Sequence, residues 1–358
     1  MENPFKFGSV VEAQYFTDRR QERDYLLQIL QSPNHAVLIS PRRFGKSSLV
    51  QETLRTVRRP RISLNLQAVT STTRLAEALL RRVFALYPYE KVRHYFSHFR
   101  LIPTFSVNPV TGTTEVSFHP DADSQIALED VFDLLEKLGK NKRLIVILDE
   151  FQEILKIDRN LDSILRSIMQ EQQNINYVLM GSQEDMMKKI FERKKSPFYH
   201  FGALIRLDKI PYEDFFRYLS DRFGRLPQVP DAAAVSDEIL RITSCHPYYT
   251  QQLAFQTWYV ALSGSDGDPV GLAAEQLVRM HDFDYERLWD GMNMTNRAVL
   301  MQLATSKSSP LGKRSQPTST VFSALKRLIA AGIVIKLDSY EIDDPFFARW
   351  IRETLNSD

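Results

Sequence analysis

Strand-like and helix-like patterns of hydrophobic positions alternate along the first part of the chain. Residues 34–40 (NHAVLIS) form a short apolar run, residues 47–59 have the apolar spacing of a helix, and residues 61–69 alternate as a strand does. Residues 143–150 (RLIVILDE) and 174–183 (NINYVLMGSQ) are nearly unbroken aliphatic runs, which is typical of parallel strands covered on both faces. This alternation predicts an α/β fold with a doubly wound parallel sheet.

Further elements lie within and after this βαβ pattern. Residues 75–98 have helical spacing, and two β-rich runs around a Pro-Val-Thr-Gly turn predict a hairpin insertion at about residues 101–120. Residues 124–139 predict another helix, and residues 204–210 (LIRLDKI) one more strand. We therefore expect the sheet domain to extend over residues 1–211.

The strand signals stop beyond Tyr212, and helical spacing continues in their place. We expect a separate all-α domain over residues 212–284, interrupted by the Gly/Ser/Asp-rich stretch SGSDGDPVG. From residue 285 to residue 358 the order of helices, a Ser/Lys/Pro loop, another helix and the run GIVIKLDSYEI predicts a winged helix.

Length and composition agree with a multidomain protein of ordinary type. The 358 residues exceed the size at which single cores stop growing. There are 46 Lys and Arg against 44 Asp and Glu, so the charge alone implies no nucleic acid. A single cysteine, Cys245, excludes an internal disulfide framework, and no apolar run or amino-terminal pattern predicts a membrane span or a signal peptide. We expect a reducing, cytoplasmic setting without a membrane.

The segment SPRRFGKSS between the first strand and the first helix of the βαβ unit has the pattern of a phosphate-binding loop. Gly45, Lys46 and Ser47 match the end of G-x-x-x-x-G-K-[ST], whereas Ser40 stands in place of the first glycine. We expect backbone N–H groups and the helix dipole to hold phosphates, Lys46 to reach the outer phosphates from an exposed loop, and the Ser47 hydroxyl to bind Mg²⁺. The simpler alternative is that Gly-Lys-Ser-Ser only begins a surface helix.

Two carboxylates at the end of residues 143–150 favour the phosphate loop over that alternative. Phosphoryl transfer needs one carboxylate to hold Mg²⁺ and a second to deprotonate the attacking water, and we assign Asp149 and Glu150 to these roles. Ser182 and Gln183 end the next strand and are candidates for sensing the γ-phosphate, although a plain turn is equally compatible with them. The basic run KKIFERKK that follows is better explained by a solvated helix face than by a partner contact.

With these residues in view, the chain resembles the archaeal-type ATPases of the STAND group of P-loop NTPases, which are relatives of the AAA+ proteins. The motifs that carry the resemblance are NPFKFGSVV with YFTDRRQE, SPRRFGKSSL, ILDEFQEI, CHPYYTQQL and YEIDDPFFARWI. The resemblance implies an opening strand, a helix start at Arg19 and Glu22, and a lid motif whose histidine and proline border the nucleotide. The cofactor-binding residues expected from the loop and the resemblance are Ser40, Pro41, Arg42, Arg43, Phe44, Gly45, Lys46, Ser47, Ser48, Arg19, His246 and Pro247.

The sequence departs from the family pattern at two places. Cys245 replaces the glycine of the lid motif, and His246 beside it is equally compatible with a nucleotide contact and with a satisfied core histidine. Phe201 stands where many relatives carry an arginine finger. Hydrolysis is therefore expected to be slow unless Arg193, Arg206 or an arginine of a partner supplies the charge.

These features lead to two hypotheses on function. The first is a Mg-ATP-binding, slowly hydrolysing ATPase that acts as a molecular switch, with ATP or ADP and Mg²⁺ as cofactors and Glu150, Lys46, Asp149 and Ser182 as catalytic residues. The alternative is a winged-helix DNA-binding protein, a regulator or a mobile-element or defence factor, in which the nucleotide is a structural cofactor. The third winged-helix helix, about residues 318–331, offers only a modestly basic surface of Ser319, Ser323, Lys326 and Arg327, with Lys313 and Arg314 before it. Contact with a protein partner, or self-association through the lid and winged helix, is therefore favoured over DNA.

Overall fold

The computed structural model describes residues 2–11, 13–107, 114–119, 121–264, 267–305 and 318–355. Contacts divide the chain into two compact units. The sheet unit comprises Arg20–Pro41 and Leu49–Leu207, and the helical unit comprises Met1–Arg19, Arg42–Ser48 and Asp208–Asp358.

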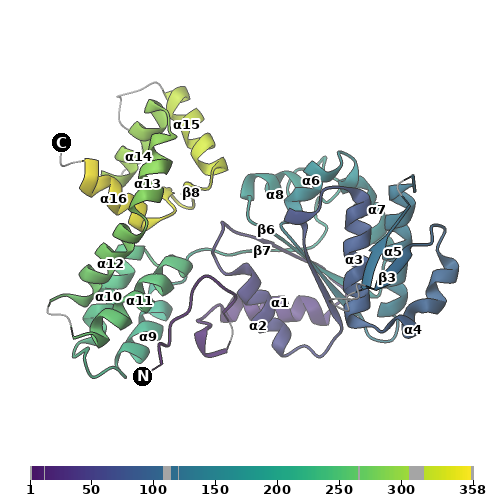
Figure 1. Ribbon diagram of the computed structural model, residues 1–358, viewed down its shortest axis with the longest axis horizontal. Helices are drawn as coiled ribbons and strands as arrows, with labels where there is room; N and C mark the ends of the chain where they lie inside the picture. Colours follow the sequence, from purple (N-terminus) through teal and green to yellow (C-terminus); the bar gives the residue numbers. More distant parts are fainter. Residues whose placement is uncertain are drawn as a thin grey trace. The chain divides into compact units, whose positions relative to one another are not determined.

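A parallel sheet organises the sheet unit (Figure 1). Its five strands lie in the order β2-β5-β6-β1-β7, and every neighbouring pair is parallel. The strands are β1 (Ala36–Ile39), β2 (Arg61–Asn65), β5 (Leu144–Asp149), β6 (Ile175–Gly181) and β7 (Ala203–Arg206). Ile39 pairs with Gly181 and Asn65 pairs with Asp149, so the carboxyl ends of these strands lie at one edge of the sheet. The predicted doubly wound α/β class is confirmed.

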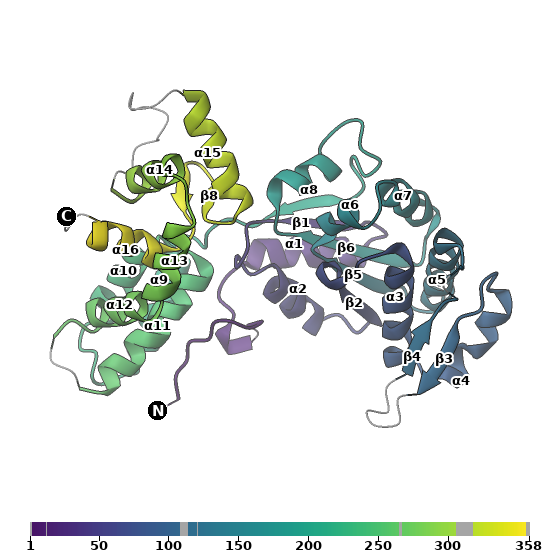
Figure 2. The same ribbon diagram turned by 45° about the horizontal axis from the view of Figure 1, so that its top comes forward.

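Helices cover both faces of this sheet because its central strands are apolar on both sides. All residues of β1 and β6 are buried. Figures 1 and 2 show α1 and α2 on one face and α3, α5 and α7 on the other. The helices of this unit are α1 (Arg20–Gln31), α2 (Lys46–Arg55), α3 (Thr72–Leu86), α4 (Tyr89–Val92), α5 (Ser124–Gly139), α6 (Ile154–Ile157), α7 (Leu161–Glu171) and α8 (Glu184–Phe191), with the short 3-10 helices η2 (Leu66–Ala68), η3 (Arg93–His98) and η4 (Phe151–Glu153).

The helix predicted over residues 75–98 is wrong as a single element. Helix α3 ends at Leu86, Tyr87 is its cap, and Pro88 precedes α4. Proline has no N–H to continue the ladder and disfavours the helical conformation of the residue before it, so the helix breaks here in spite of its apolar spacing. The hairpin insertion is confirmed as the antiparallel pair β3 (Thr104–Val107) and β4 (Thr114–Ser117), and its predicted Pro-Val-Thr-Gly turn lies outside the described residues.

The opening strand implied by the resemblance is also wrong. Described residues before the 3-10 helix η1 (Ala13–Tyr15) pair with no strand, and this segment instead lies along the helical unit. Phe5 is buried in that unit's core, and the Asn3 side chain donates to the Phe255 carbonyl at 3.0 Å.

One continuous hydrophobic core holds the helical unit together. It extends from the lid to the carboxyl-terminal helix, and the predicted boundary between residues 284 and 285 falls inside α13. Helix α14, helix α15, the antiparallel hairpin β8-β9 and helix α16 follow in the element order of a winged helix. The elements are α9 (Tyr212–Phe223), α10 (Ala232–Thr243), α11 (Pro247–Leu262), α12 (Pro269–Met280), α13 (Asp282–Asp290), α14 (Met294–Thr305), α15 (Thr318–Ala330), β8 (Val334–Lys336), β9 (Tyr340–Ile342) and α16 (Pro345–Leu355).

Helix α15 corresponds to the predicted third helix, whereas Lys313 and Arg314 lie outside the described residues. Among helices in the described ranges, none has both the length and the apolar content that crossing a bilayer requires.

Candidate functional site

The predicted phosphate loop connects β1 to α2 through two left-handed backbone positions. Arg43 has φ 63° and Gly45 has φ 89°. Left-handed residues that alternate with ordinary ones turn successive backbone N–H groups toward one side and make an anion-binding concavity. Glycine adopts this conformation without strain, whereas Arg43 does so at a cost, and such outliers are concentrated at functional sites.

The side chains of the loop are more enclosed than the sequence indicates. Lys46 is the first residue of α2 and is only 7% exposed, so the expectation of an exposed loop position is wrong. Ser47 is half-buried. The hydroxyl of Ser40 donates to the Pro41 carbonyl at 3.0 Å, and that of Ser48 accepts from the Val11 N–H at 3.1 Å. Ser40 and Ser48 thus also hold the loop and the amino-terminal segment in place.

Arg19 and Arg42 are the remaining predicted cations near the loop. Arg19 is buried, has φ 63°, and donates to the carbonyls of Phe44 at 3.4 Å and of Asp208. Arg42 is exposed. Arg19 therefore ties the loop to the segment that leads into the lid.

Phe44 of the loop contacts the predicted lid motif. Its buried ring packs edge-on against His246, with centroids 4.8 Å apart and planes at 77°. His246 is the cap of α11, and Pro247 is its first residue. Ser244 and Cys245 before them have φ 49° and 59°, so the cysteine that replaces the family glycine occupies a left-handed position that glycine would adopt without strain.

Both ring nitrogens of His246 have protein partners. Nδ1 accepts from the backbone N–H groups of Tyr248 at 3.2 Å and Tyr249 at 3.5 Å. Since Nδ1 accepts, the ring proton resides on Nε2, which lies 3.3 Å from Asp343 Oδ1 and donates to it. Asp343 lies between β9 and α16, so His246 connects the predicted phosphate loop to the segment that leads into α16.

Arg43 makes a second connection from the loop to the lid. Its guanidinium donates to the Tyr249 hydroxyl at 2.8 Å and lies 4.6 Å above the centre of the Tyr248 ring. Burial and the nearby carboxylates of Asp344 and Asp343 raise the pKa of Tyr249, so its hydroxyl stays protonated. Sequence reasoning missed Tyr249 and Asp343. The motifs HPYY and DDP were visible, but nothing in either motif indicates that it contacts the loop.

Glu150 and Ser182 are brought together at the carboxyl edge of the sheet. The Ser182 hydroxyl donates to Glu150 Oε2 at 2.8 Å, although 32 positions separate the two residues. Glu150 follows β5 in a left-handed conformation with φ 53°, and its N–H donates to Asp149 Oδ1 at 2.9 Å. Gln183 caps α8 without a side-chain hydrogen bond to that helix.

The loop begins at this same edge of the sheet unit. The Ser40 N–H donates to the Gly181 carbonyl at 3.5 Å, directly before Ser182. Asn65 at the end of β2 pairs with Asp149. Ser40, Asp149, Glu150 and Ser182 therefore lie where open α/β sheets bind their ligands, beyond the carboxyl ends of the strands.

Comparison with known proteins decides the family. A family model described as an ATPase domain predominantly from Archaea matches residues 16–253, which is well over half of the chain. The chain belongs to this ATPase family. No curated protein matches the ATPase in sequence.

Solved structures show the fold of the ATPase over nearly its whole length. A Walker-type ATPase of Pyrococcus abyssi is 18% identical, with 95% of this chain and 97% of that chain covered and a TM-score of 0.66. The ORC2 protein of Aeropyrum pernix in its ADPNP-ADP complexes is 15% identical, with 99% and 98% covered and a TM-score of 0.57. The ADP form of that protein is 14% identical, with 95% and 93% covered and a TM-score of 0.51.

The residues predicted to hold Mg²⁺ have the donor chemistry that this ion requires. Mg²⁺ binds oxygen ligands, keeps several waters, and takes one or two carboxylates together with substrate phosphates. The Ser47 hydroxyl and the Asp149 carboxylate are donors of this kind. Within the described residues, no group of three or more His, Cys, Asp and Glu side chains is arranged to hold a metal by itself.

Phe201 of the ATPase, at the place of the missing arginine, has a packing role. Its ring is stacked on His35 with centroids 4.6 Å apart, and the Arg166 guanidinium lies 5.2 Å above its centre. Of the two arginines named as substitutes, Arg206 is paired with Glu192, and Arg193 is exposed.

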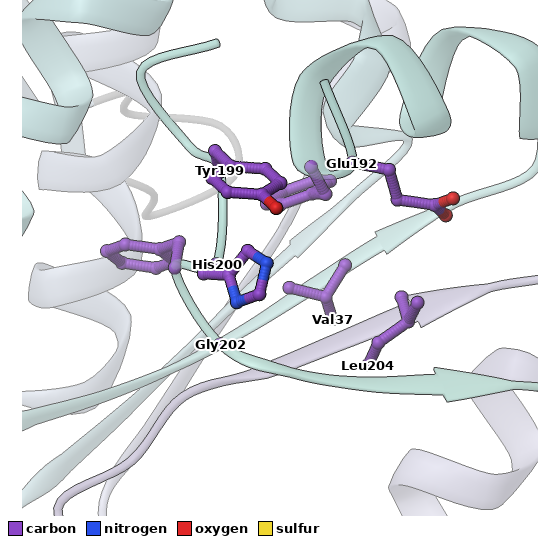
Figure 3. Close-up of a pocket in the computed structure, with 8 residues that line it drawn as sticks. Val37, Glu192, Tyr199, His200, Gly202 and Leu204 are labelled. Atoms are coloured by element: carbon purple, nitrogen blue, oxygen red, sulfur yellow. The ribbon is translucent and has the colours of Figure 1, made fainter. Parts of the chain in front are cut away.

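A separate cavity of about 260 Å³ lies beside Phe201 (Figure 3). Tyr199, His200 and Phe191 line it together with Val37 and Leu204 of the sheet. None of the predicted phosphate-loop or acidic residues contributes to its lining.

Proposed function

We propose that this ATPase is a nucleotide-dependent molecular switch of the STAND group, which binds Mg-ATP and hydrolyses it slowly. In this proposal the loop N–H groups and Lys46 hold the phosphates, and Ser47 and Asp149 hold Mg²⁺. Glu150 is the general base.

The observation that carries the switch is the set of contacts that runs from the loop to the winged helix. Phe44 contacts His246, and His246 donates to Asp343 at the start of α16. Arg43 bonds to Tyr249 one turn further along α11. We expect loop residues to move according to whether the γ-phosphate is present or absent. Because Phe44 and Arg43 contact side chains at the start of α11, such a movement would change the positions of the lid and winged helix. A switch needs contacts that differ between its two states, and we expect these contacts to differ between the ATP and ADP forms.

Hydrolysis requires a base for the attacking water and stabilisation of the charge on the γ-phosphate. The Glu150 carboxylate accepts the proton of the water, and Ser182 orients that carboxylate through its hydrogen bond. Bound Mg²⁺ supplies neutralisation of phosphate charge. A finger arginine can contribute several powers of ten in rate, so Phe201 in its place supports slow turnover and a long-lived switch state.

Helix α15 supports a protein partner more than DNA. Phe322 on its outer side is 45% exposed, and Lys326 lies 4.8 Å above the centre of the Phe322 ring. Arg327 donates to Asn296 of α14 at 3.1 Å. An exposed aromatic ring favours contact with a protein, including self-association through the lid and winged helix. Because Lys326 and Arg327 already have intramolecular partners, they are less suited to binding the phosphates of DNA. Binding to random duplex DNA with a steep salt dependence would support the alternative, a winged-helix regulator or mobile-element or defence factor.

Hydrogen exchange and solution mass test the switch together. We expect Mg-ATP and ADP to give different exchange rates in residues 340–350 and different masses at equal protein concentration. A Lys46→Ala variant should show neither difference. Identical exchange and identical mass with the two nucleotides would refute the switch while leaving ATP hydrolysis intact.

A further inference from the structure

Gln152 has an unusual environment two residues after Glu150. The side chain is 0% exposed, and its amide nitrogen donates to Glu150 Oε2. Its Oε1 is buried and has no hydrogen-bond partner among the residues that the structure describes. A buried amide oxygen without a hydrogen-bond partner lowers the stability of the fold, so its presence calls for an explanation such as a function of the other end of the amide.

The orientation of this amide follows from the chemistry of its partner. An ionised carboxylate only accepts hydrogen bonds, so the NH₂ end must face Glu150, and the opposite orientation would place two oxygens against each other. Gly181 leaves room for the amide oxygen: a Cβ there would lie 2.4 Å from Gln152 Oε1 and 2.3 Å from Met187 Sδ. Even an alanine at position 181 would thus displace Gln152 or Met187.

Gln152 and Ser182 donate to the same carboxylate oxygen. Ser182 approaches Oε2 of Glu150 from the end of β6, and Gln152 approaches it from η4. Two donors at one oxygen fix the orientation of the carboxylate plane. Neither donor occupies Oε1, which is therefore the oxygen available to a water molecule.

We propose that Gln152 is a positioning residue that directs Glu150 Oε1 toward the attacking water, an inference that rests on the proposed function of Glu150 as the base. In the step that it assists, the water oxygen bonds to the γ-phosphorus and the water proton goes to Oε1. The bond from the γ-phosphorus to the bridging oxygen breaks, and that oxygen leaves with ADP. Gln152 touches neither water nor phosphate and acts through Glu150.

Single-turnover hydrolysis at pH 7 with protein in excess over ATP, together with calorimetric titration with Mg-ATP, tests this role. Gln152→Met keeps the length of the side chain and removes the donor. We expect a rate about tenfold lower or more, with Mg-ATP affinity within about twofold of wild type, because the base is misdirected while the nucleotide still binds. Ser182→Ala should lower the rate in the same way.

Gln172→Met is the matched control. Gln172 is also hydrogen-bonded in the sheet unit, to the Phe132 carbonyl and the Tyr177 hydroxyl, and it makes no contact with Glu150. Its single-turnover rate and its Mg-ATP affinity should coincide with those of the wild type. If Gln152→Met does not fold, Gln152→Asn, which withdraws the amide by one methylene group, takes its place with the same expected loss of rate.

The outcomes separate this inference from the proposed function. A wild-type single-turnover rate in Gln152→Met, with Glu150→Gln inactive, overturns the positioning role and leaves Glu150 as the base. Wild-type turnover in Glu150→Gln overturns the base assignment and the positioning role with it.

Discussion

Phe44 of the predicted phosphate loop packs edge-on against His246 at the start of α11, with ring centroids 4.8 Å apart. The same histidine donates to Asp343, which lies 97 positions further along the chain. A single imidazole thus contacts the β1–α2 loop on one side and the segment between β9 and α16 on the other. This arrangement makes His246 the first place to test how nucleotide state reaches the carboxyl-terminal helices.

Replacing His246 should uncouple the winged helix from the nucleotide. Asparagine can still cap α11, so His246→Asn is expected to bind ATP near wild-type affinity but to lose the nucleotide-dependent exchange difference in α16. His246→Ala also removes the cap and should lower the free energy of unfolding by a further ~1 kcal/mol. Exchange measurements and urea titration check these outcomes, and Asp343→Asn should reproduce the uncoupling. Retained coupling in both His246 variants would contradict the role.

Lys46→Ala should weaken ATP binding by about a hundredfold or more, because an ammonium that neutralises phosphate charge is lost. Lys46 is largely buried, so Lys46→Met, which keeps the apolar stem, controls for lost packing. Calorimetric titration gives the affinities, with the exposed Lys142→Ala as reference. Binding at wild-type affinity in both Lys46 variants would exclude this loop as the phosphate site.

Glu150→Gln and Asp149→Asn should separate chemistry from metal binding. The amide in Glu150→Gln cannot accept the proton of water, so we expect near-normal Mg-ATP binding and hydrolysis slower by about a hundredfold or more. Asp149→Asn should weaken magnesium-dependent binding instead. Titrations with and without Mg²⁺, alongside phosphate release, distinguish the two. Equal effects of both variants on binding would show that the roles are not divided in this way.

The wild-type protein should hydrolyse ATP at well below about one turnover per second, since Phe201 occupies the place where the family resemblance implies an arginine finger. Steady-state phosphate release over a range of protein concentrations measures this. A rate per protomer that rises with concentration would indicate an arginine donated across an interface, and Arg193→Ala should then remove the rise. Fast turnover that is independent of concentration would contradict the slow switch.

The pH dependence of the free energy of unfolding should reveal the protonation of the His35 ring. Burial, with the charges of Arg166 and Arg143, lowers the pKa of His35 from 6.5 to about 4. Its Nδ1 accepts from the Tyr177 N–H at 3.3 Å, a bond that only the neutral ring can make. Between these two pH values the unfolded state binds the proton more readily. The free energy of unfolding should therefore fall as pH drops from 6.5 toward 4, by up to about 3 kcal/mol.

Urea unfolding at a series of pH values checks this slope. His35→Asn keeps an acceptor without a titrating ring and should flatten the curve, whereas the exposed His200→Asn in the same unit should leave it unchanged. A slope that His35→Asn does not alter would assign the acid sensitivity to other groups.

The sequence by itself determined the class of the fold and which polar side chains follow the strands at the edge of the sheet. Unbroken aliphatic runs such as residues 144–148 are typical of strands covered on both faces, and parallel strands place the residues that follow them at one edge. Asp149, Ser182 and the beginning of the loop therefore lie at a common edge for reasons that local patterns encode. The helix break at Pro88 could have been predicted from the sequence, because the effect of proline on the backbone is local. The apolar spacing on both sides of Pro88 instead led to the prediction of one continuous helix.

Only the tertiary structure decided which of these side chains meet and how each is held. Arg43 and Tyr249 are 206 positions apart, and their bond depends on the path of the chain through a shared core. Gln152 contacts Glu150 because Gly181 leaves space for its amide, which is a matter of packing between β6 and η4. Periodicity specifies which face of an element is apolar. It does not specify which polar groups become enclosed when distant elements pack, and those enclosed groups set the orientation of the candidate site.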